Sequence, residues 1–153
     1  MADSPAGSPV VGIAAIRSVA LVGAAASGKT TLVEALLHKA GTIAAQGSLD
    51  RGSTVCDFDP LERRVGHSLQ SALVHLDYQG TRIHLIDTPG AADFVGQSLP
   101  ALEAVETAAL VINAQTGIEM MSARMMDSIK KRELCCLIIV TKIDAQGVDL
   151  PGV

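Results

Sequence analysis

One octapeptide limits what this chain can fold into more than any other feature. Residues 23–30 read GAAASGKT and match the pattern G-x-x-x-x-G-K-[ST] at every fixed position. An apolar run with β-branched residues precedes the octapeptide at 17–22, and a helix-forming segment follows at 29–40. A glycine-rich turn between a buried strand and a helix places a ring of backbone N–H groups at a helix N-terminus, where anions bind. The sequence therefore predicts a βα unit whose turn binds phosphate.

The chemistry of this turn gives its side chains distinct roles. Small side chains ahead of the lysine let the backbone approach a phosphate closely. We expect Lys29 to bridge the β- and γ-phosphates of a nucleotide and Thr30 to bind Mg²⁺ through its hydroxyl. The predicted nucleotide-binding residues of the turn are Gly23, Ala24, Ala25, Ala26, Ser27, Gly28, Lys29, Thr30 and Thr31.

Apolar segments that alternate with turn signals predict an α/β fold. The expected strands lie at 17–22, 69–78, 81–86, 108–113 and 134–140, with the second and third around a tight turn and the other three buried. The expected helices lie at 29–40, 98–105 and 119–132. Pro100 suits the first turn of the second helix, and residues 42–66 are expected to form a long polar loop. This order predicts the three-layer fold of a P-loop nucleoside triphosphatase, with a mostly parallel sheet, one antiparallel strand and helices on both faces.

Composition narrows the class of protein further. The 153 residues are 48% hydrophobic and 18% charged, with a formal net charge of −4, which excludes intrinsic disorder and disfavours a broad basic surface for nucleic acid. No apolar run is long enough for a membrane span. We therefore expect a cytoplasmic protein without membrane contact, and without direct sequence-specific nucleic-acid binding by this segment. We expect residues 1–16 to be a flexible lead-in and 17–153 to form one partial nucleotide-binding domain.

Two smaller packing expectations complete this interpretation. Leu32, Leu36 and Leu37 are expected to share the buried face of the first helix. The three cysteines, Cys56, Cys135 and Cys136, have no zinc-ligand spacing and are interpreted as small buried side chains of a reducing compartment.

Polar residues follow two of the predicted strands. Asp87, at the end of one strand, suits an outer ligand of Mg²⁺, and the Gly90 N–H can reach a γ-phosphate, although Asp, Pro and Gly also form plain turns. After the last strand, Asp144 can accept hydrogen bonds from the N1–H and amine of guanine, which adenine does not present. Lys142 can lay its stem along a base plane, and Thr141 precedes it.

In combination, these motifs resemble those of a known family. The stretches at 19–37, 52–64 and 85–96 are similar to the guanine-nucleotide domain of the translational GTPases, and most closely to elongation factor G and its paralogues. The resemblance implies binding of GTP and GDP with Mg²⁺ and a ribosomal partner. It implies Ser68 as a further Mg²⁺ ligand, beside Thr30 and Asp87, in the first switch segment. It places Asp87, Gly90, Thr141, Lys142 and Asp144 at the nucleotide, with Lys29 and Gly90 acting in hydrolysis.

The sequence departs from that family at several positions. Ala91 stands where the family has a water-orienting histidine, Thr141 where it has asparagine, and Ser68 where it has threonine. Ala24 and Ala26 replace a histidine and an acidic residue of the phosphate loop. The family's domain also continues with another helix, strand and closing helix, so this chain resembles its N-terminal part.

Three functional hypotheses remain open on the sequence alone. The first is a Mg²⁺-dependent GTP-binding switch in which hydrolysis is slow because of Ala91. The second is an ATP-dependent P-loop enzyme such as a small kinase, and the third is a module that binds nucleotide without catalysis. His67, beside Ser68, is a conceivable catalytic substitute for the missing histidine, although an ordinary exposed loop histidine is the simpler interpretation.

Overall fold

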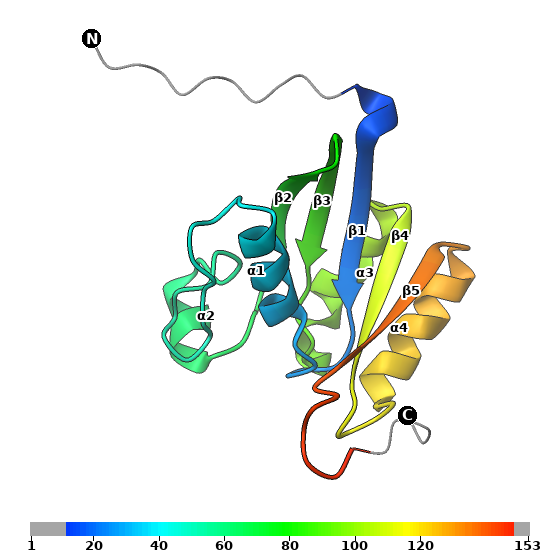
Figure 1. The fold of residues 1–153 in the computed structure, drawn as a ribbon. Helices are drawn as coiled ribbons and strands as arrows, with labels where there is room; N and C mark the ends of the chain where they lie inside the picture. Colours follow the sequence, from blue (N-terminus) through cyan, green and yellow to red (C-terminus); the bar gives the residue numbers. More distant parts are fainter. Residues whose placement is uncertain (1–11, 149–153) are drawn as a thin grey trace.

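A five-stranded sheet in the order β2-β3-β1-β4-β5 carries the other elements of the computed structural model, which describes residues 12–148 (Figure 1). The strands are β1 (Ile16–Val22), β2 (Ala72–Tyr78), β3 (Thr81–Asp87), β4 (Thr107–Asn113) and β5 (Cys135–Thr141). The helices are α1 (Lys29–Lys39), α2 (Pro60–Val65), α3 (Val95–Glu103) and α4 (Met120–Lys131), with 3-10 turns η1 (Ile13–Ala15) and η2 (Ala92–Phe94). Only β2 runs antiparallel to its neighbour, so the predicted mostly parallel P-loop fold is confirmed.

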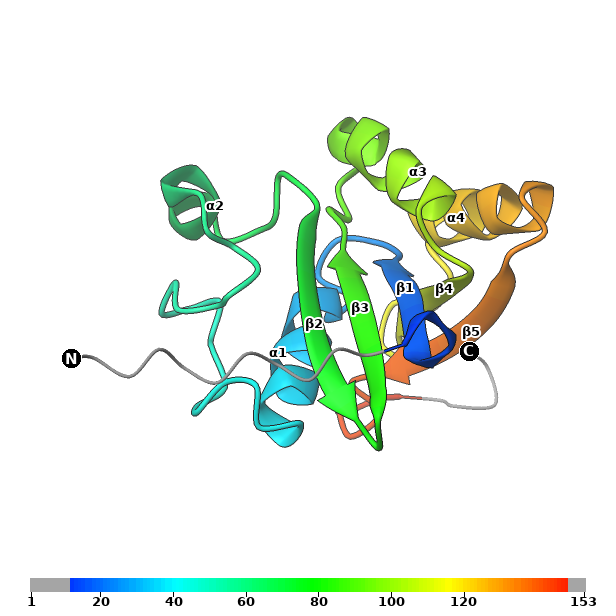
Figure 2. The ribbon, with the colours of Figure 1, turned by 90° about the horizontal axis from the view of Figure 1, so that it is seen from above.

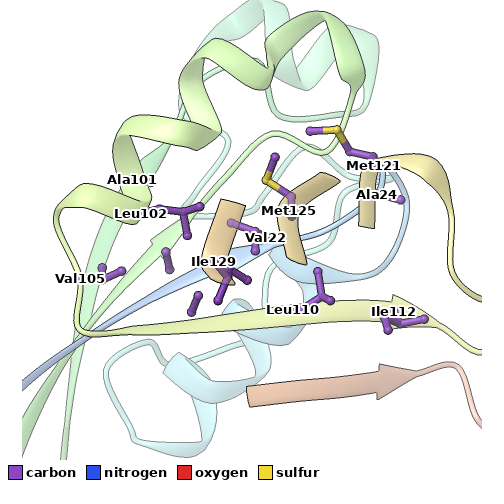
Figure 3. Close-up of a cluster of buried hydrophobic side chains, with 12 residues drawn as sticks. Val22, Ala24, Ala101, Leu102, Val105, Leu110, Ile112, Met121, Met125 and Ile129 are labelled. Carbon is purple, nitrogen blue, oxygen red and sulfur yellow. The ribbon is translucent and has the colours of Figure 1, made fainter. Parts of the chain in front are cut away.

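Helices cover both faces of the sheet, as predicted. Figure 2 shows α1 on one face and α3 with α4 on the other. Alternate residues of β1 serve the two sides: Leu21 packs in the cluster on the α1 face, whereas Val22 packs in the cluster beneath α3 and α4. In the second cluster Met125 and Ile129 of α4 are fully buried (Figure 3). Aliphatic side chains thus fix the sheet between its helices and hold the ends of β1 and β3 in place.

The segment at 42–66 is not the uninterrupted loop that we expected. Residues Pro60–Val65 form α2, which starts with a capping box: the Asp59 side chain accepts from Leu61 N, and the Glu62 side chain accepts from Asp59 N. The following strand begins at Ala72 rather than at residue 69, because the amides of residues 69 and 70 donate to the Glu62 carboxylate instead of joining the sheet.

The prediction that Pro100 lies in the first turn of its helix is wrong. The helix α3 begins at Val95, so Pro100 is its sixth residue and cannot donate to the Gly96 carbonyl. Both Gly96 and Pro100 are exposed, and water can therefore bond the carbonyl that the proline leaves free.

The burial expected for α1 and β5 also needs correction. In α1 Val33 and Leu37 are buried, whereas Leu36 is 38% exposed. Cys135 and Cys136 are exposed, because β5 is an edge strand paired on one side only, by β4. Cys56, in contrast, is buried in the cluster on the α1 face, and burial raises the pKa of its thiol.

The described residues begin inside the predicted flexible segment and end five residues before the end of the sequence. Of the predicted flexible segment 1–16, residues 1–11 lie outside the described residues, as do residues 149–153. Residues Ile13–Ala15 form a 3-10 turn, and β1 already begins at Ile16. Within residues 12–148 no helix has both the length and the apolar character that a membrane crossing requires.

Candidate functional site

A cavity of about 450 Å³ lies where the loop after β1, the segment after α2 and the end of β3 meet. Its lining consists of Ala25, Ala26, Gly28, Lys29, Thr30, Thr31, Leu49, Gly66, His67, Ser68, Thr88, Gly90 and Ala91. The carboxyl ends of neighbouring parallel strands meet at one edge of an α/β sheet, which is where ligands of such folds bind. The cavity therefore lies at the position that the strand order predicts for a ligand.

The backbone of residues 23–28 is curled into a shape that requires glycine at its ends. Gly23 has a φ of +142°, and a Cβ built on it would lie 2.3 Å from the Val111 carbonyl oxygen of β4. Gly28, with a φ of +92°, is the N-cap of α1. Ala26 has a φ of +56° in spite of its side chain. This curl turns the loop into the N-terminus of α1, where free amides attract an anion.

The Lys29 ammonium lies inside this loop. Its Nζ donates to the carbonyl oxygen of Ala24 at 2.7 Å and to that of Gly23 at 3.1 Å. Burial lowers the pKa of Lys29 to about 8, against the opposing attraction of Asp87 and then Glu119. The side chain is therefore a buried cation that loses its proton more easily than an exposed lysine, and a bound phosphate would stabilise its charged form.

Thr30 and Asp87 form the central contact of the site. The Thr30 hydroxyl donates to Asp87 Oδ2 at 2.6 Å, and Thr30 Oγ1 lies 3.3 Å from Ser68 Oγ. Asp87 Oδ1 is buried and has no hydrogen-bond partner among the described residues. Burial raises the pKa of Asp87 to about 6; the Thr30 hydrogen bond and Lys29 oppose this rise, and Asp57 and Glu34 add to it.

These groups suit a hard divalent cation. Hydroxyl and carboxylate oxygens are the ligands that Mg²⁺ prefers, and it commonly keeps several waters. Thr30 and Ser68 would offer hydroxyl oxygens, and the orphan oxygen of Asp87 would accept from a cation-bound water. The residues present therefore fit the ion that the phosphate-loop pattern implies.

Gly90 abuts the phosphate loop. A Cβ built on Gly90 would lie 2.5 Å from both Lys29 Nζ and the Ala24 carbonyl oxygen, so only glycine fits there. Ala91 follows and lines the cavity with a methyl group that can neither donate nor accept a proton. His67 lines the same cavity, with its ring 6.3 Å from that of Phe94.

The structure does not bring the predicted base-binding residues into this cavity. The Thr141 hydroxyl contacts the Ser27 carbonyl at 2.7 Å and the Ile112 carbonyl at 3.2 Å, so it ties the end of β5 to the phosphate loop. Lys142 and Asp144 are exposed in the turn beyond it. Asp144 nevertheless lies only three residues past a side chain that touches the loop, on the same edge of the sheet.

Some residues of the site were not predicted from the sequence. Leu49, Gly66 and Thr88 line the cavity, and the Thr88 hydroxyl donates to the Leu21 carbonyl at 2.7 Å, which joins the ends of β3 and β1. The buried carboxylate of Glu34 was not predicted either. A signal existed for α2, since the spacing of Asp59 and Glu62 is that of a capping box. No such pattern indicated that Glu34 is buried, because a single acidic residue in a helix is usually exposed to solvent.

Comparisons with known proteins agree with this geometry. The family model of the elongation factor Tu GTP binding domain matches residues 14–151. An elongation factor G-like protein of Mycobacterium tuberculosis is 40% identical over 129 residues, which cover 84% of this chain and 18% of that protein. Tetracycline resistance protein TetO of Streptococcus mutans is 35% identical over 127 residues, covering 83% of this chain and 20% of TetO.

Solved structures extend the comparison to the fold. A crystal structure of a protein from Thermus thermophilus has a TM-score of 0.87 and 37% identity, and the match covers 91% of this chain and 21% of the other. A bacterial selenocysteine-specific elongation factor shares the fold at a TM-score of 0.68 and 22% identity. The chain thus spans about a fifth of the length of the relatives it matches. With a phosphate loop, a Thr30–Asp87 contact and a family match over residues 14–151, the chain belongs to the elongation factor Tu GTP binding domain family of translational GTPases.

Proposed function

We propose that this chain binds GTP and GDP in a Mg²⁺-dependent manner, as the guanine-nucleotide domain of an elongation-factor-G-like GTPase. The contact between Thr30 and Asp87 carries the proposal, because it joins the phosphate loop to the end of β3 at a buried carboxylate. A buried carboxylate with one unpartnered oxygen is costly unless a cation or a bound water accompanies it.

Recognition of the base rests on Asp144. Its carboxylate is exposed, and it follows the strand whose last residue, Thr141, contacts the phosphate loop. A carboxylate accepts the N1–H and the 2-amino group of guanine and repels the acceptor nitrogen of adenine. Lys142, in the same turn, supplies an aliphatic stem for the face of the base.

Hydrolysis of GTP is proposed to be slow. Lys29 would hold the β- and γ-phosphates, and the Gly90 N–H would donate to the γ-phosphate. Bound Mg²⁺ would neutralise charge that develops on the phosphate oxygens. Ala91 can neither orient nor deprotonate a water, and loss of one positioned acid–base group costs about 10²–10⁴ in rate.

The cellular setting is proposed from the family alone. The relatives include an elongation factor G-like protein and tetracycline resistance proteins. Such a domain would act in the cytoplasm with the ribosome as its partner. The net charge of −4 argues against direct sequence-specific nucleic-acid binding by this segment.

Nucleotide competition tests the binding proposal. A fluorescent GDP analogue is bound to the chain with Mg²⁺ and then challenged with unlabelled nucleotides. We expect GTP and GDP to displace it and ATP to leave it bound. Equal displacement by ATP would favour the ATP-dependent P-loop enzyme, and failure of the analogue to bind at all would contradict the proposal.

A single-turnover assay tests the slow step. The parent, Ala91→His and His67→Ala are compared with and without ribosomes, on the longest natural form of the protein. We expect Ala91→His to accelerate hydrolysis with unchanged GTP affinity, and His67→Ala to leave the rate unchanged. A fast parent that Ala91→His does not improve would contradict the role assigned to position 91, and a loss of rate in His67→Ala would transfer the role to His67.

A further inference from the structure

Three buried carboxylates lie beside the cavity, and the proposed function uses none of them. They belong to Glu34, Asp57 and Glu62, which are 0%, 2% and 1% exposed. Glu34 accepts from the amides of residues 47 and 55, and Glu62 accepts from the amides of residues 59, 69 and 70. These two acids therefore hold the backbone of the segment that passes over the phosphate loop.

Asp57 differs from the other two because its partners are hydroxyls. Asp57 Oδ1 accepts from Ser68 Oγ at 2.7 Å, and Asp57 Oδ2 accepts from Thr54 Oγ1 at 2.9 Å. A hydroxyl rotates to suit its surroundings, so its direction is set by the acceptor that takes its proton. Asp57 thus determines where the lone pairs of the Ser68 oxygen point.

The hydroxyl protons of Thr30 and Ser68 both point away from the space between the two oxygens. Each hydroxyl has a single proton. Thr30 donates its proton to Asp87, and Ser68 donates its proton to Asp57. Thr30 Oγ1 and Ser68 Oγ, 3.3 Å apart, are then left facing each other without a proton between them. Two neighbouring ligands of an octahedral Mg²⁺ ion are about 2.9 Å apart, which is close to this spacing.

We propose that Asp57 is a positioning residue of the cation site: it takes the proton of the Ser68 hydroxyl and so turns the lone pairs of that oxygen toward Thr30 and the cation. The inference rests on the Mg²⁺-dependent nucleotide binding proposed above. Without an acceptor at position 57, the Ser68 hydroxyl can turn its proton toward Thr30 Oγ1, where it would repel a cation.

The backbone around Ser68 is held independently of the Asp57 carboxylate. Glu62 bonds the two amides that follow Ser68. The Arg63 side chain donates to the Asp57 carbonyl at 2.9 Å, a bond that any residue at position 57 would keep. Loss of the Asp57 carboxylate should therefore free the Ser68 hydroxyl without releasing the segment that carries it.

A double-mutant cycle tests the proposal. Guanine-nucleotide affinity is measured against Mg²⁺ concentration for the parent, Asp57→Ala, Ser68→Ala and the double variant. Since a hydrogen bond to a charged group is at stake, we expect each single change to raise the Mg²⁺ concentration at half-effect roughly tenfold. The double variant should match Ser68→Ala, because Asp57 acts only through that hydroxyl.

Two matched variants separate positioning from structure. Asp57→Asn keeps an acceptor oxygen for Ser68 and can donate to Thr54, so it should stay within about threefold of the parent. Thr54→Val removes the other hydrogen bond of Asp57 and should also leave the Mg²⁺ dependence close to that of the parent. Asp57→Leu, which fills more of the space of the carboxylate, replaces Asp57→Ala if the alanine variant does not fold.

Hydrogen exchange of the nucleotide-free protein gives a readout that does not depend on nucleotide. We expect Asp57→Ala to leave the exchange of the Leu69 and Gln70 amides within about threefold of the parent, since Glu62 holds them. A large increase there would show that Asp57 merely holds the segment in place and would overturn the proposal.

The outcomes of the cycle are distinguishable. If the parent binds guanine nucleotide without any Mg²⁺ dependence, the proposed function is wrong and this inference falls with it. If the parent depends on Mg²⁺ but Asp57→Ala behaves like the parent, only the positioning role is overturned. Additive effects of Asp57→Ala and Ser68→Ala would overturn it as well, because independent contributions mean that Asp57 does not act through Ser68.

Discussion

The hydroxyl of Thr30 donates to Asp87 Oδ2 at 2.6 Å, although 57 positions separate the two residues in the chain. The contact exists because β1 and β3 are adjacent and parallel, so that the loop after one strand and the last residue of the other meet. It joins the first turn of α1 to the residue that precedes the segment 88–91.

The Mg²⁺ affinity of the nucleotide complex should fall at low pH because Asp87 becomes protonated. Burial raises the pKa of its carboxyl to about 6, and only the ionised form attracts a cation. Below about pH 6 a proton competes with Mg²⁺, so the Mg²⁺ affinity of the nucleotide complex should fall about tenfold per pH unit. Titrations between pH 5 and pH 7.5 measure this slope. Asp87→Asn should show weak Mg²⁺ dependence with no such slope, whereas Asp127→Asn, an exposed acid of α4, should keep the parent's profile.

The carboxyl of Asp87 should also make the free energy of unfolding depend on pH when no cation is present. The pKa of Asp87 in the folded chain lies above its ordinary value of 3.8, so between pH 3.8 and about 6 the folded state holds a proton that the unfolded state has lost. The stability that this proton contributes is present below pH 3.8 and is lost as pH rises toward 6. Thermal melts in EDTA should show that component in the parent and lack it in Asp87→Asn. Identical pH profiles for the two proteins would contradict a raised pKa at this site.

Phosphate binding should depend on the charge of Lys29. Removal of a charge-assisted contact costs roughly 1.5–3 kcal/mol, so Lys29→Ala should lower nucleotide affinity by about tenfold or more. Because burial lowers the pKa of Lys29 to about 8, affinity of the parent should also decline as pH rises through that value. Fluorescence titration from pH 7 to pH 9.5 measures both effects. Lys39→Ala, at the exposed end of α1, is the control and should bind like the parent.

Gly23 should not tolerate any side chain. A Cβ there would lie 2.3 Å from the Val111 carbonyl oxygen, and the φ of +142° is unfavourable for other residues. Gly23→Ala should therefore cost about 3 kcal/mol or more, which lowers the melting temperature by roughly 6–12 °C in a domain of this size. Gly96→Ala is the matched control, since Gly96 is in α3 and its Cβ position has no atom within 4 Å beyond its chain neighbours and the backbone of its own helix. The control should be neutral or stabilising by up to about 1 kcal/mol. Equal melting temperatures for the two variants would show that Gly23 is not packed as described.

The part of the site that could be predicted from the sequence is the part formed at the carboxyl ends of the strands. The Gly23–Thr30 pattern, the apolar runs and the rule that parallel strands end at one edge suffice to bring Thr30 and Asp87 together. The exposure of Cys135 and Cys136 could not be predicted in this way, because an apolar run indicates a strand but not how many neighbours it has. The burial of Val33 in place of Leu36 depends on how α1 rotates against the sheet, a choice that a leucine pattern leaves open.

The segment before β2 was the hardest to predict, for a different reason. Its composition is polar, and polar residues are typical of loops. In the structure the carboxylates of Glu62, in this segment, and of Glu34, in α1, are buried and accept from backbone amides. Such hydrogen bonds join residues that are far apart in the sequence, so no pattern of neighbouring residues predicts them. The capping box of Asp59 and Glu62 was the one local sign that α2 would form.

Guanine specificity should be carried by Asp144. Its carboxylate can accept from both N–H groups on the recognition edge of guanine, and replacement by an amide exchanges one acceptor for a donor. Asp144→Asn should therefore weaken GTP binding and favour xanthine nucleotides, whose carbonyl at position 2 needs a donor. Fluorescence titration with GTP and XTP measures both affinities. Asp50→Asn, an exposed acid elsewhere in the chain, should leave the ratio of the two affinities unchanged. Unchanged GTP affinity in Asp144→Asn would remove Asp144 from the base site and would leave the exposed turn after Thr141 without a role in recognition.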